Sequence, residues 1–137
     1  MTVQADVELL RNAYDAFARR DLPAVLDIMH PDIEWVIPAG ASFGGVHRGH
    51  VSAVRKVLMS APADGNAFRT EPEEFLEAGG AVVVLGNHRG RVGGDGAEFE
   101  IPFAHVWELR DGLVVRCRSY VDTAQLNAVL AAGPSHP

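Results

Sequence analysis

The sequence has a single cysteine, no long apolar run and more acidic than basic residues, and each scarcity excludes a class of protein. One thiol, Cys117, cannot form an internal disulfide, which fits a protein of the reducing cytoplasm. The longest apolar run, from Ala81 to Gly86, is far too short to cross a bilayer. No basic segment leads into an apolar one at the N-terminus, so we expect no export signal.

Basic residues are also scarce, because 12 lysines and arginines stand against 18 aspartates and glutamates, for a net charge of −6. This balance, without any basic run, argues against binding to nucleic acid or to an anionic membrane. The chain has no CxxC motif, and no two histidines share a metal-ligand spacing on one predicted helix or strand. We therefore expect no metal, and we expect no other cofactor.

The abundant residues are those of an ordinary globular protein. With 137 residues, 47% of them hydrophobic and 22% charged, the chain is long enough for one domain with a hydrophobic core. We find no internal repeat and no linker in it. We predict a single domain over residues 1–131 and a flexible tail over 132–137.

The first half of the chain has the apolar spacing of helices. One predicted helix presents a stripe of residues at spacings of four and three, namely Val3, Val7, Leu10, Tyr14 and Phe17. A second, short helix can be capped by Asp21 and must end before Pro31. Its apolar residues are Leu22, Val25, Leu26 and Met29. A short strand over 33–37 follows, and a glycine-rich loop leads to a third helix with Val51, Val54, Val57 and Leu58.

The second half has the alternation and tight turns of antiparallel strands. Strands are predicted over about 68–78, 81–91 and 97–109, and a last strand begins at Leu113. Pro72 marks the first of these as an edge strand or a bulged one. We predict that Arg110-Asp111-Gly112 closes the last hairpin as a three-residue loop. Asp122 and Gln125 have the spacing of a capping box at the start of a terminal helix.

Alternation also assigns the faces of these strands. The odd-numbered residues from Phe99 to Leu109 should point to the interior, and the glutamates between them outward. A four-residue turn sets Arg89 opposite Glu100, so that opposite charges pair on the outer face. The three-residue loop sets Leu109 opposite Leu113 and His105 opposite Cys117. The polar residues of the predicted inner face are His88, His105, Cys117 and Ser119.

Several motifs cover nearly the whole chain in a characteristic order. They are Tyr14-Asp15-Ala16-Phe17, Arg20-Asp21-Leu22, His30-Pro31-Asp32-Ile33-Glu34-Trp35, Val46-His47-Arg48-Gly49-His50, Ala104-His105-Val106-Trp107, Arg110-Asp111-Gly112 and Arg118-Ser119-Tyr120-Val121-Asp122-Thr123. Together they resemble the SnoaL-like proteins related to ketosteroid isomerase, of the nuclear transport factor 2-like superfamily. The resemblance implies an α+β fold of cystatin-like topology, in which a cone-shaped, curved antiparallel sheet and helices enclose a pocket, and in which dimers are common.

The resemblance does not imply a reaction, because residues of the family's known mechanisms are replaced in this chain. Tyr14 falls where steroid isomerases place the tyrosine that donates to the enolate. However, Ile37 replaces their general base, and His105 lies roughly at their second oxyanion donor. Ser119 stands where the cyclases carry a catalytic aspartate, and His88 and Gly90 lie near the positions of the arginine and aspartate used by epoxide hydrolases. None of these three mechanisms can run unchanged here.

The candidate catalytic residues are His105, His88 and Tyr14. A neutral, inward imidazole can accept a proton near pH 7, or one histidine can act as base while the other polarises a carbonyl oxygen. Each residue also has a plainer interpretation. Both histidines can be buried residues with protein partners, and the Tyr14 hydroxyl can meet a fixed acceptor instead of a ligand.

The predicted ligand-binding residues are Trp35, Ile37, Phe43, Phe103, Trp107, Cys117 and Ser119. Trp35 can form a flat pocket wall or belong to the core, and Ser119 has no base beside it in sequence that would make it a nucleophile. Cys117 is expected to be an inert packed thiol. Asp122 is expected on the outer face as a helix cap.

Two functions remain open from the sequence. In the first, the protein is an isomerase, cyclase or lyase that acts on an enolisable apolar metabolite by histidine acid–base chemistry. In the second, the pocket binds a hydrophobic molecule without chemistry, or the fold serves as a dimerisation module. We expect a homodimer, because the outer face of the last two strands carries an apolar strip of Val106, Ala104, Val114 and Tyr120.

Overall fold

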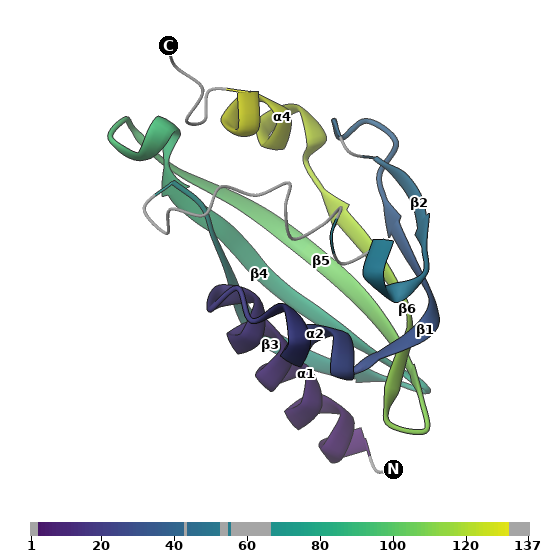
Figure 1. The fold of residues 1–137 in the computed structure, drawn as a ribbon. Coiled ribbons are helices and arrows are strands. Elements are labelled where there is room, and N and C mark those ends of the chain that lie inside the picture. The colour runs from purple at the N-terminus through teal and green to yellow at the C-terminus, as the bar shows by residue number, and fades with distance from the viewer. Residues whose placement is uncertain (1–2, 43, 53–54, 56–66, 132–137) are drawn as a thin grey trace.

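The computed structural model describes residues 3–42, 44–52, 55 and 67–131. Within these residues an open, curved sheet of six strands is accompanied by three helices (Figure 1). The α+β class and the curved sheet predicted from the sequence are confirmed, and the sheet is antiparallel as predicted except for one pair of strands. Over the same part of the chain, no helix has the length and apolar character needed to cross a membrane.

Two helices form the first part of the fold. The first, α1 (Val3–Ala18), turns its apolar stripe to the sheet, so that Leu10 and Tyr14 are buried. The second, α2 (Leu22–Asp27), begins where the Asp21 carboxylate accepts a hydrogen bond from the Ala24 N–H, as the capping signal predicted. Met29 does not belong to this helix as expected. It begins the next strand, because the helix ends two residues earlier.

The sheet has the strand order β2-β1-β6-β5-β4-β3. The strands are β1 (Met29–Ile37), β2 (Gly45–Arg48), β3 (Arg69–Ala78), β4 (Ala81–Arg91), β5 (Glu98–Arg110) and β6 (Leu113–Val121). All neighbours are antiparallel except β1 and β6, which are parallel. Strand β2 lies in the segment that the sequence predicted to be a glycine-rich loop. It pairs with β1 at the edge of the sheet, where a short strand needs little apolar sequence.

The pairing of β4 with β5 follows the predicted register. His88 lies opposite Ile101, and Arg89 lies opposite Glu100, with 2.8 Å between Arg89 Nε and Glu100 Oε2. A short 3-10 turn, η1 (Val92–Gly94), begins the connection between these two strands. At the outer edge, β3 has the register shift that its Pro72 predicted, between Pro72 and Glu74.

The predicted register of the last hairpin is wrong. Its turn has two central residues, Asp111 and Gly112, both with positive φ (53° and 77°), as in the primed turns that suit twisted hairpins. Arg110 therefore pairs with Leu113, and a bulge then inserts one extra residue, Val115, into β6. His105 consequently faces Ser119 instead of Cys117.

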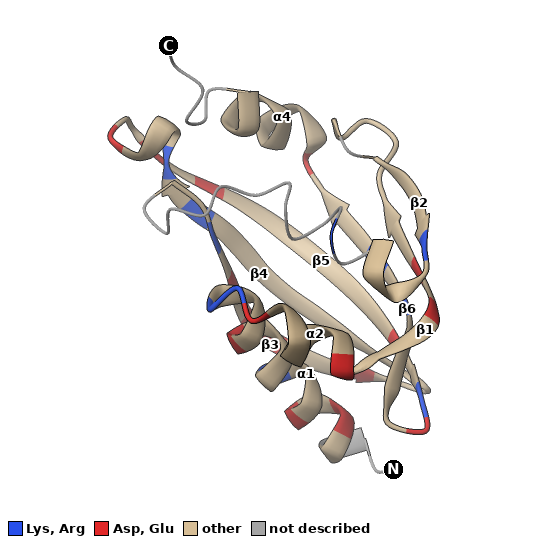
Figure 2. Cartoon of the chain, in the orientation of Figure 1, with Lys and Arg blue, Asp and Glu red and all other residues tan. Residues whose placement is uncertain are grey.

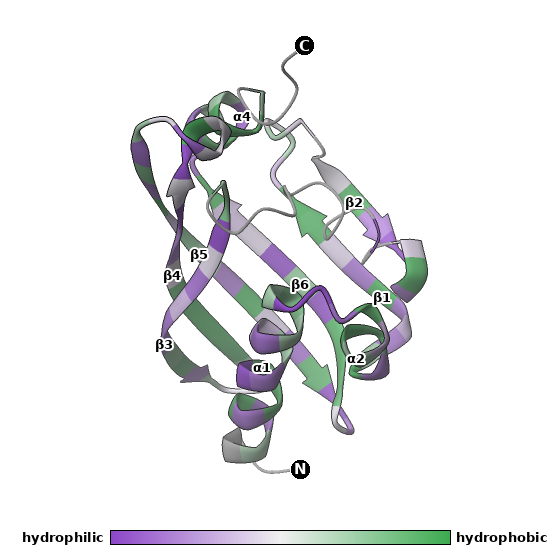
Figure 3. Cartoon of the chain, turned by 60° about the vertical axis from the view of Figure 1, so that its left-hand side comes forward, coloured by the Kyte–Doolittle hydropathy of each residue, from purple (hydrophilic) through white to green (hydrophobic). Residues whose placement is uncertain are grey.

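The bulge also changes which apolar residues of β6 point inward. The total shift is two residues at 117 and 119, so these positions keep their predicted inner face. Val114, however, is fully buried and cannot belong to the outer apolar strip proposed from the sequence. The banded hydropathy of the strands is visible in Figure 3.

Different helices lie near the two ends of the sheet. Helices α1 and α2 lie together near one end of the sheet, and α4 (Thr123–Ala131) lies near the other (Figure 1). At the start of α4, Asp122 is the N-cap, because its carboxylate accepts hydrogen bonds from the Gln125 N–H (3.1 Å) and side-chain amide (2.9 Å). The Gln125 side chain thus bonds the cap carboxylate, where a capping box would have it accept from the cap N–H. Most of the predicted third helix, together with Phe43 and the tail 132–137, lies outside the described residues.

Candidate functional site

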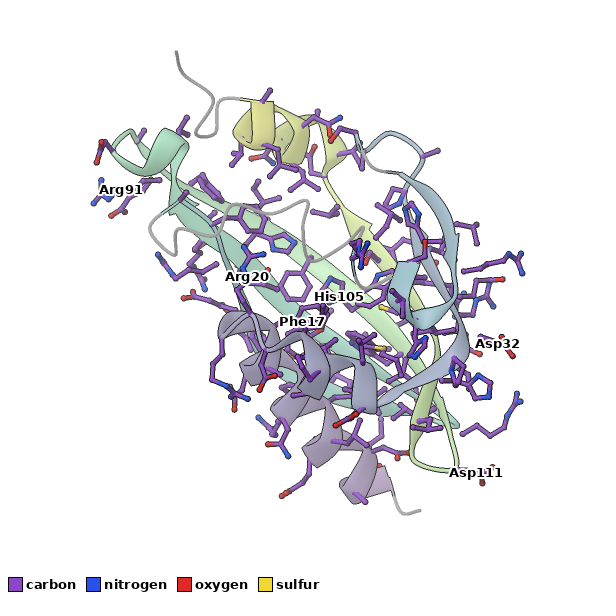
Figure 4. The ribbon with its side chains drawn as sticks, viewed as in Figure 1. Phe17, Arg20, Asp32, Arg91, His105 and Asp111 are labelled. Carbon is purple, nitrogen blue, oxygen red and sulfur yellow. The ribbon has the colours of Figure 1, made fainter. Side chains whose placement is uncertain are left out.

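A chain of buried hydrogen bonds joins α1 to the inner face of β5. The Trp107 indole N–H donates to the Tyr14 hydroxyl oxygen at 3.0 Å, and that hydroxyl lies 2.6 Å from His105 Nδ1. The strand alternation turns His105 and Trp107 to the same side, and the helix stripe turns Tyr14 toward them. In Figure 4 His105 and the α1 residue Phe17 both lie in the interior of the fold.

These hydrogen bonds favour one tautomer of His105. The Tyr14 hydroxyl has one hydrogen, is buried, and has no acceptor in the described structure other than His105 Nδ1. Because Trp107 can only donate, the hydrogen bonds are all satisfied when Tyr14 donates to Nδ1. The second nitrogen, Nε2, then carries the hydrogen of the neutral ring. In the described part of the chain it has no hydrogen-bond partner.

Burial keeps both inward histidines uncharged. It lowers the pKa of His105 from 6.5 to about 3, with a further contribution from the neighbouring His88. It also lowers the pKa of His88 from 6.5 to about 4. The two rings lie 6.3 Å apart between centroids, and each stacks or tilts against Phe103. At neutral pH the site therefore contains two neutral imidazoles.

His88 has its own partner on the neighbouring strand. Its Nδ1 lies 3.1 Å from the Thr70 hydroxyl, because β3 sets Thr70 directly opposite His88. The Nε2 atom has no partner among the residues that the structure covers. Since a hydroxyl can either donate or accept, His88 can hold either neutral tautomer.

These side chains line a cavity of about 110 Å³ between the sheet and the helices. Its described wall consists of Tyr14, Phe17, Trp35, Ile37, Phe68, Thr70, His88, His105, Trp107, Ser119, Val121, Leu126 and Leu130. This wall is mostly aromatic and aliphatic, and it contains no Asp, Glu, Lys or Arg. The charged residues are found at other positions of the strands, in the turns and on the helices (Figure 2). Such a cavity is suited to an uncharged, mostly apolar molecule.

Most residues that the sequence selected for the site reach this cavity. His105, His88, Tyr14, Trp35, Ile37, Trp107 and Ser119 all line it. Two do not. Phe103 and Cys117 point inward as predicted, but they are buried in the core at 4% and 0% exposure and are not part of the wall. Burial raises the pKa of the Cys117 thiol, so it is not a nucleophile at neutral pH.

The cavity also includes residues that the sequence did not identify as part of the site. Phe17 lies three residues after Tyr14 on the same helix stripe, so the spacing could have indicated it. Leu126 and Leu130 are four residues apart on α4, so they lie on one face of the terminal helix that the sequence predicted. Phe68 and Thr70 could not be assigned, because the bulge at Pro72 obscures the alternation of β3.

The remaining candidate residues have structural roles. Asp122 caps α4 on the outside, as expected. His30 accepts a hydrogen bond from the Asp32 N–H at the partly exposed start of β1. Across the described ranges, no three His, Cys, Asp or Glu side chains come together in a group that could hold a metal ion.

The comparisons with known proteins agree with this geometry. The model of the SnoaL-like domain matches residues 10–117. The chain belongs to the SnoaL-like family. An NTF2-like protein of unknown function from Burkholderia pseudomallei has a similar structure, with 32% identity, a TM-score of 0.79, and coverage of 95% of this chain and 98% of that one. The family therefore places the chain in the NTF2-like superfamily, as the sequence motifs predicted.

Two further relatives have similar levels of identity. TerC, co-crystallised with polyporic acid, is 30% identical with a TM-score of 0.76, over 93% of this SnoaL-like chain and 98% of TerC. An uncharacterised protein of Mycobacterium tuberculosis is 33% identical over 86 residues. That match spans 62% of this chain and 66% of the mycobacterial protein.

Proposed function

We propose that this SnoaL-like protein binds an uncharged, mostly apolar small molecule that carries a carbonyl-type oxygen, and that it promotes enolisation of that molecule. The observation that carries the proposal is the hydrogen-bonded chain from Trp107 through Tyr14 to Nδ1 of His105, a residue that lines the cavity, which makes Nε2–H the free donor of this ring. A fixed donor in an apolar site can stabilise the negative charge that develops on an enolate oxygen. The co-crystallisation of TerC with polyporic acid supports a small-molecule site in this fold.

The two histidines would have different roles in this reaction. His88 Nε2 accepts the proton from the carbon next to the carbonyl when Thr70 holds the proton of His88 on Nδ1. The electrons of that C–H bond form a C=C bond, and the carbonyl oxygen takes the negative charge. His105 Nε2–H donates to this oxygen. Return of the proton to another carbon completes an isomerisation, and loss of a leaving group completes an elimination.

This assignment differs from the role that the sequence favoured for His105. A proton acceptor at Nε2 of His105 requires the other tautomer, in which the Tyr14 hydroxyl hydrogen has no acceptor among the described residues. The acid–base role of His105 therefore stays a prediction, and the donor role is the one we propose. A neutral imidazole with a lowered pKa is a suitable donor, because it keeps its proton and acquires no competing charge.

Proton exchange on a simple ketone tests the reaction without knowledge of the natural substrate. The probe is para-ethylacetophenone in deuterated buffer, with loss of the acetyl proton signal followed by NMR. We expect the wild type to accelerate exchange and both His88→Gln and His105→Phe to reduce it by about 10²–10⁴-fold. His30→Phe, outside the cavity, is the matched control.

Binding without chemistry is the alternative, supported by the absence of a carboxylate in the described wall. In that case para-ethylacetophenone binds more tightly than para-diethylbenzene, and the preference disappears in His105→Phe, but no variant changes the exchange rate. If the ketone has no advantage over the hydrocarbon in the wild type, the donor role of His105 is wrong.

The homodimer is also a proposal. It is supported by Tyr120, which is 50% exposed, and by the half-buried Ala104 and Val106 on the outer face of β5. Sedimentation velocity at tens of micromolar protein should give a dimer, and Tyr120→Glu should weaken it. A monomer at that concentration contradicts the proposal.

A further inference from the structure

The part of the cavity wall that β6 and α4 provide becomes apolar toward α4. On the inner face of β6, Ser119 lies directly opposite His105, and Val121 is the next residue of this strand that lines the cavity. The strand then leads into α4, whose Leu126 and Leu130 also line the cavity. Figure 1 shows α4 near the end of the sheet that lies away from α1 and α2. This part of the wall therefore changes from polar groups beside His105 to aliphatic groups at α4.

The side of the cavity next to α1 is closed by packed aromatic rings. Tyr14 and Trp107 are both buried, and they contact each other nearly at right angles with centroids 5.9 Å apart. Tyr14 also makes an edge contact with Phe75, at a centroid distance of 6.0 Å. A ligand whose oxygen accepts from His105 has little room on this side, so its apolar part extends toward α4.

One side chain joins α4 to the loop between β1 and β2. The Asn127 amide accepts a hydrogen bond from the Ser42 N–H at 2.8 Å and donates one to the Gly40 carbonyl at 2.7 Å. The loop also approaches the start of the helix closely, since a Cβ at Gly40 would lie 2.7 Å from Thr123 Oγ1. These contacts restrict the position of α4, so the leucines that it presents to the cavity form a wall of fixed depth.

The two cavity-lining leucines of α4 differ in burial. Leu126 is 4% exposed and has little accessible surface left for a ligand. Leu130, one turn further along the helix, is half-buried and lines the same cavity. Leu130 is therefore the residue of α4 with more surface available for contact with a ligand.

We propose that α4 is the end wall that limits the length of the ligand, and that Leu130 contacts the end of the ligand remote from its carbonyl oxygen. The ligand is then a compact ketone or aldehyde with one ring or a short chain. The cavity volume of about 110 Å³ supports this size, because an engineered apolar cavity of about 150 Å³ binds benzene. This inference rests on the proposed function for the position of the carbonyl oxygen, and it adds the length of the apolar part.

A series of ketones tests the end wall. The probes are para-alkylacetophenones with unbranched alkyl groups from methyl to hexyl, and isothermal titration calorimetry gives their affinities. In the wild type each added CH₂ should strengthen binding about fourfold while there is room for it. The affinity should reach its maximum at a short alkyl group and then fall, because a longer chain meets Leu130.

Variants of α4 should move this maximum in opposite directions. Leu130→Ala removes three carbon atoms from the wall and should shift the maximum to a chain longer by at least one CH₂. Leu130→Phe should shift it to a shorter chain. Val129→Ala shortens an apolar side chain of the same helix that is not in the described wall, so this control should keep the maximum of the wild type.

The wild type also provides a measurement that needs no variant. In its complex with para-ethylacetophenone, we expect nuclear Overhauser effects between the methyl group of the ethyl substituent and the Leu130 methyl groups. The acetyl methyl group should show none to Leu130. Effects from the acetyl methyl group to Leu130 instead would contradict both the end wall and the position of the carbonyl oxygen at His105.

Hydrocarbons of the same shape separate this inference from the proposed function. They are para-alkylethylbenzenes, in which an ethyl group replaces the acetyl group. If the ketones bind better than the hydrocarbons, but the affinity rises up to hexyl or the maximum is the same in the Leu130 variants, only the end wall is wrong. If the hydrocarbons bind as well as the ketones and the maximum still follows Leu130, the end wall stands and the carbonyl site is wrong. If no probe binds, both fail.

Discussion

The two faces of strands β4, β5 and β6 hold their polar groups in opposite ways. On the outer face Arg89 bridges Glu71, Glu73 and Glu100 at 2.6–2.9 Å, and these carboxylates remain 39–60% exposed. On the inner face the side chains of His105 and Trp107 are neutral, buried and joined through the Tyr14 hydroxyl.

The difference between the two faces shows which polar groups determine the geometry of the site. Exposed ion pairs contribute little to stability, because water and salt screen them and both side chains lose freedom. Buried neutral groups have few alternative partners. The loss of one of their hydrogen bonds therefore lowers stability, and each hydrogen bond that forms fixes the orientation of a side chain. We therefore expect substitutions on the inner face to change both stability and binding, and those on the outer face to change little.

The largest effect should come from the ring at the centre of the inner face. Trp107 is 1% exposed, and its replacement by alanine leaves a cavity and removes a donor to Tyr14. We expect Trp107→Ala to lower the free energy of unfolding by about 3–5 kcal/mol. Leu76→Ala, 45% exposed, should change it by less than about 1 kcal/mol. Urea denaturation measures both, and equal effects would remove the contrast between the faces.

Loss of the central hydroxyl should have the next largest effect. Tyr14→Phe keeps the ring but leaves the Trp107 N–H and His105 Nδ1 without partners. We expect a loss of about 1–3 kcal/mol in the free energy of unfolding. Tyr120→Phe, which removes the same hydroxyl from a half-exposed ring, should stay within about 0.5 kcal/mol of the wild type. If Tyr14→Phe leaves the free energy of unfolding unchanged, the hydrogen bonds from Trp107 through Tyr14 to His105 do not stabilise the fold.

Acid should destabilise the protein through the two inward histidines. Their folded-state pKa values, about 4 for His88 and about 3 for His105, lie below the unfolded value of about 6.5. Below pH 6.5 the unfolded state therefore binds more protons, and stability falls as the pH drops toward about 4. Each histidine contributes a slope of up to about 1.4 kcal/mol per pH unit.

Single variants test the predicted fall in stability between about pH 6.5 and pH 5, where most carboxylates stay ionised. His105→Gln and His88→Gln should each remove about half of the slope measured by urea denaturation. A stability that is constant over this interval would show that the histidines are accessible to protons in the folded state.

The smallest effect should come from an exposed ion pair. Arg91 and Glu98 are 2.9 Å apart with side chains 48% and 75% exposed. We expect Glu98→Gln to lower the free energy of unfolding by less than about 0.5 kcal/mol, and the effect should vanish at high salt because screening removes it. A larger, salt-independent loss would show that the outer face also depends on specific polar contacts.

The sequence predicted most of the fold because its local signals agree. The apolar stripe ending at Phe17 gave the first helix, and the charges of Arg89 and Glu100 fixed the register of β4 and β5. The last hairpin was misjudged because Asp111-Gly112 suits a two-residue primed turn, and a bulge elsewhere in the strand has no local marker. The edge strand β2 is short and polar, which is why alternation did not reveal it.

The sequence predicted which side chains of the site point inward on each strand and helix, but not the contacts between these elements. Alternation turned His105 and Ser119 inward, and the helix stripe placed Tyr14 on the apolar side. The bond between Tyr14 and His105 joins residues 91 positions apart, so it depends on how α1 packs on the sheet.

In the proposed function His105 is a neutral donor whose Nε2–H is available to a ligand. Long-range proton–nitrogen NMR of the histidine rings, assigned with His105→Gln, tests it most directly, because the nitrogen shifts report both tautomer and charge. We predict that from pH 7 to pH 5 His105 stays neutral, with Nδ1 unprotonated and Nε2 protonated, as its lowered pKa requires. A neutral ring with its proton on Nδ1, or a ring that protonates near pH 6, would contradict the account.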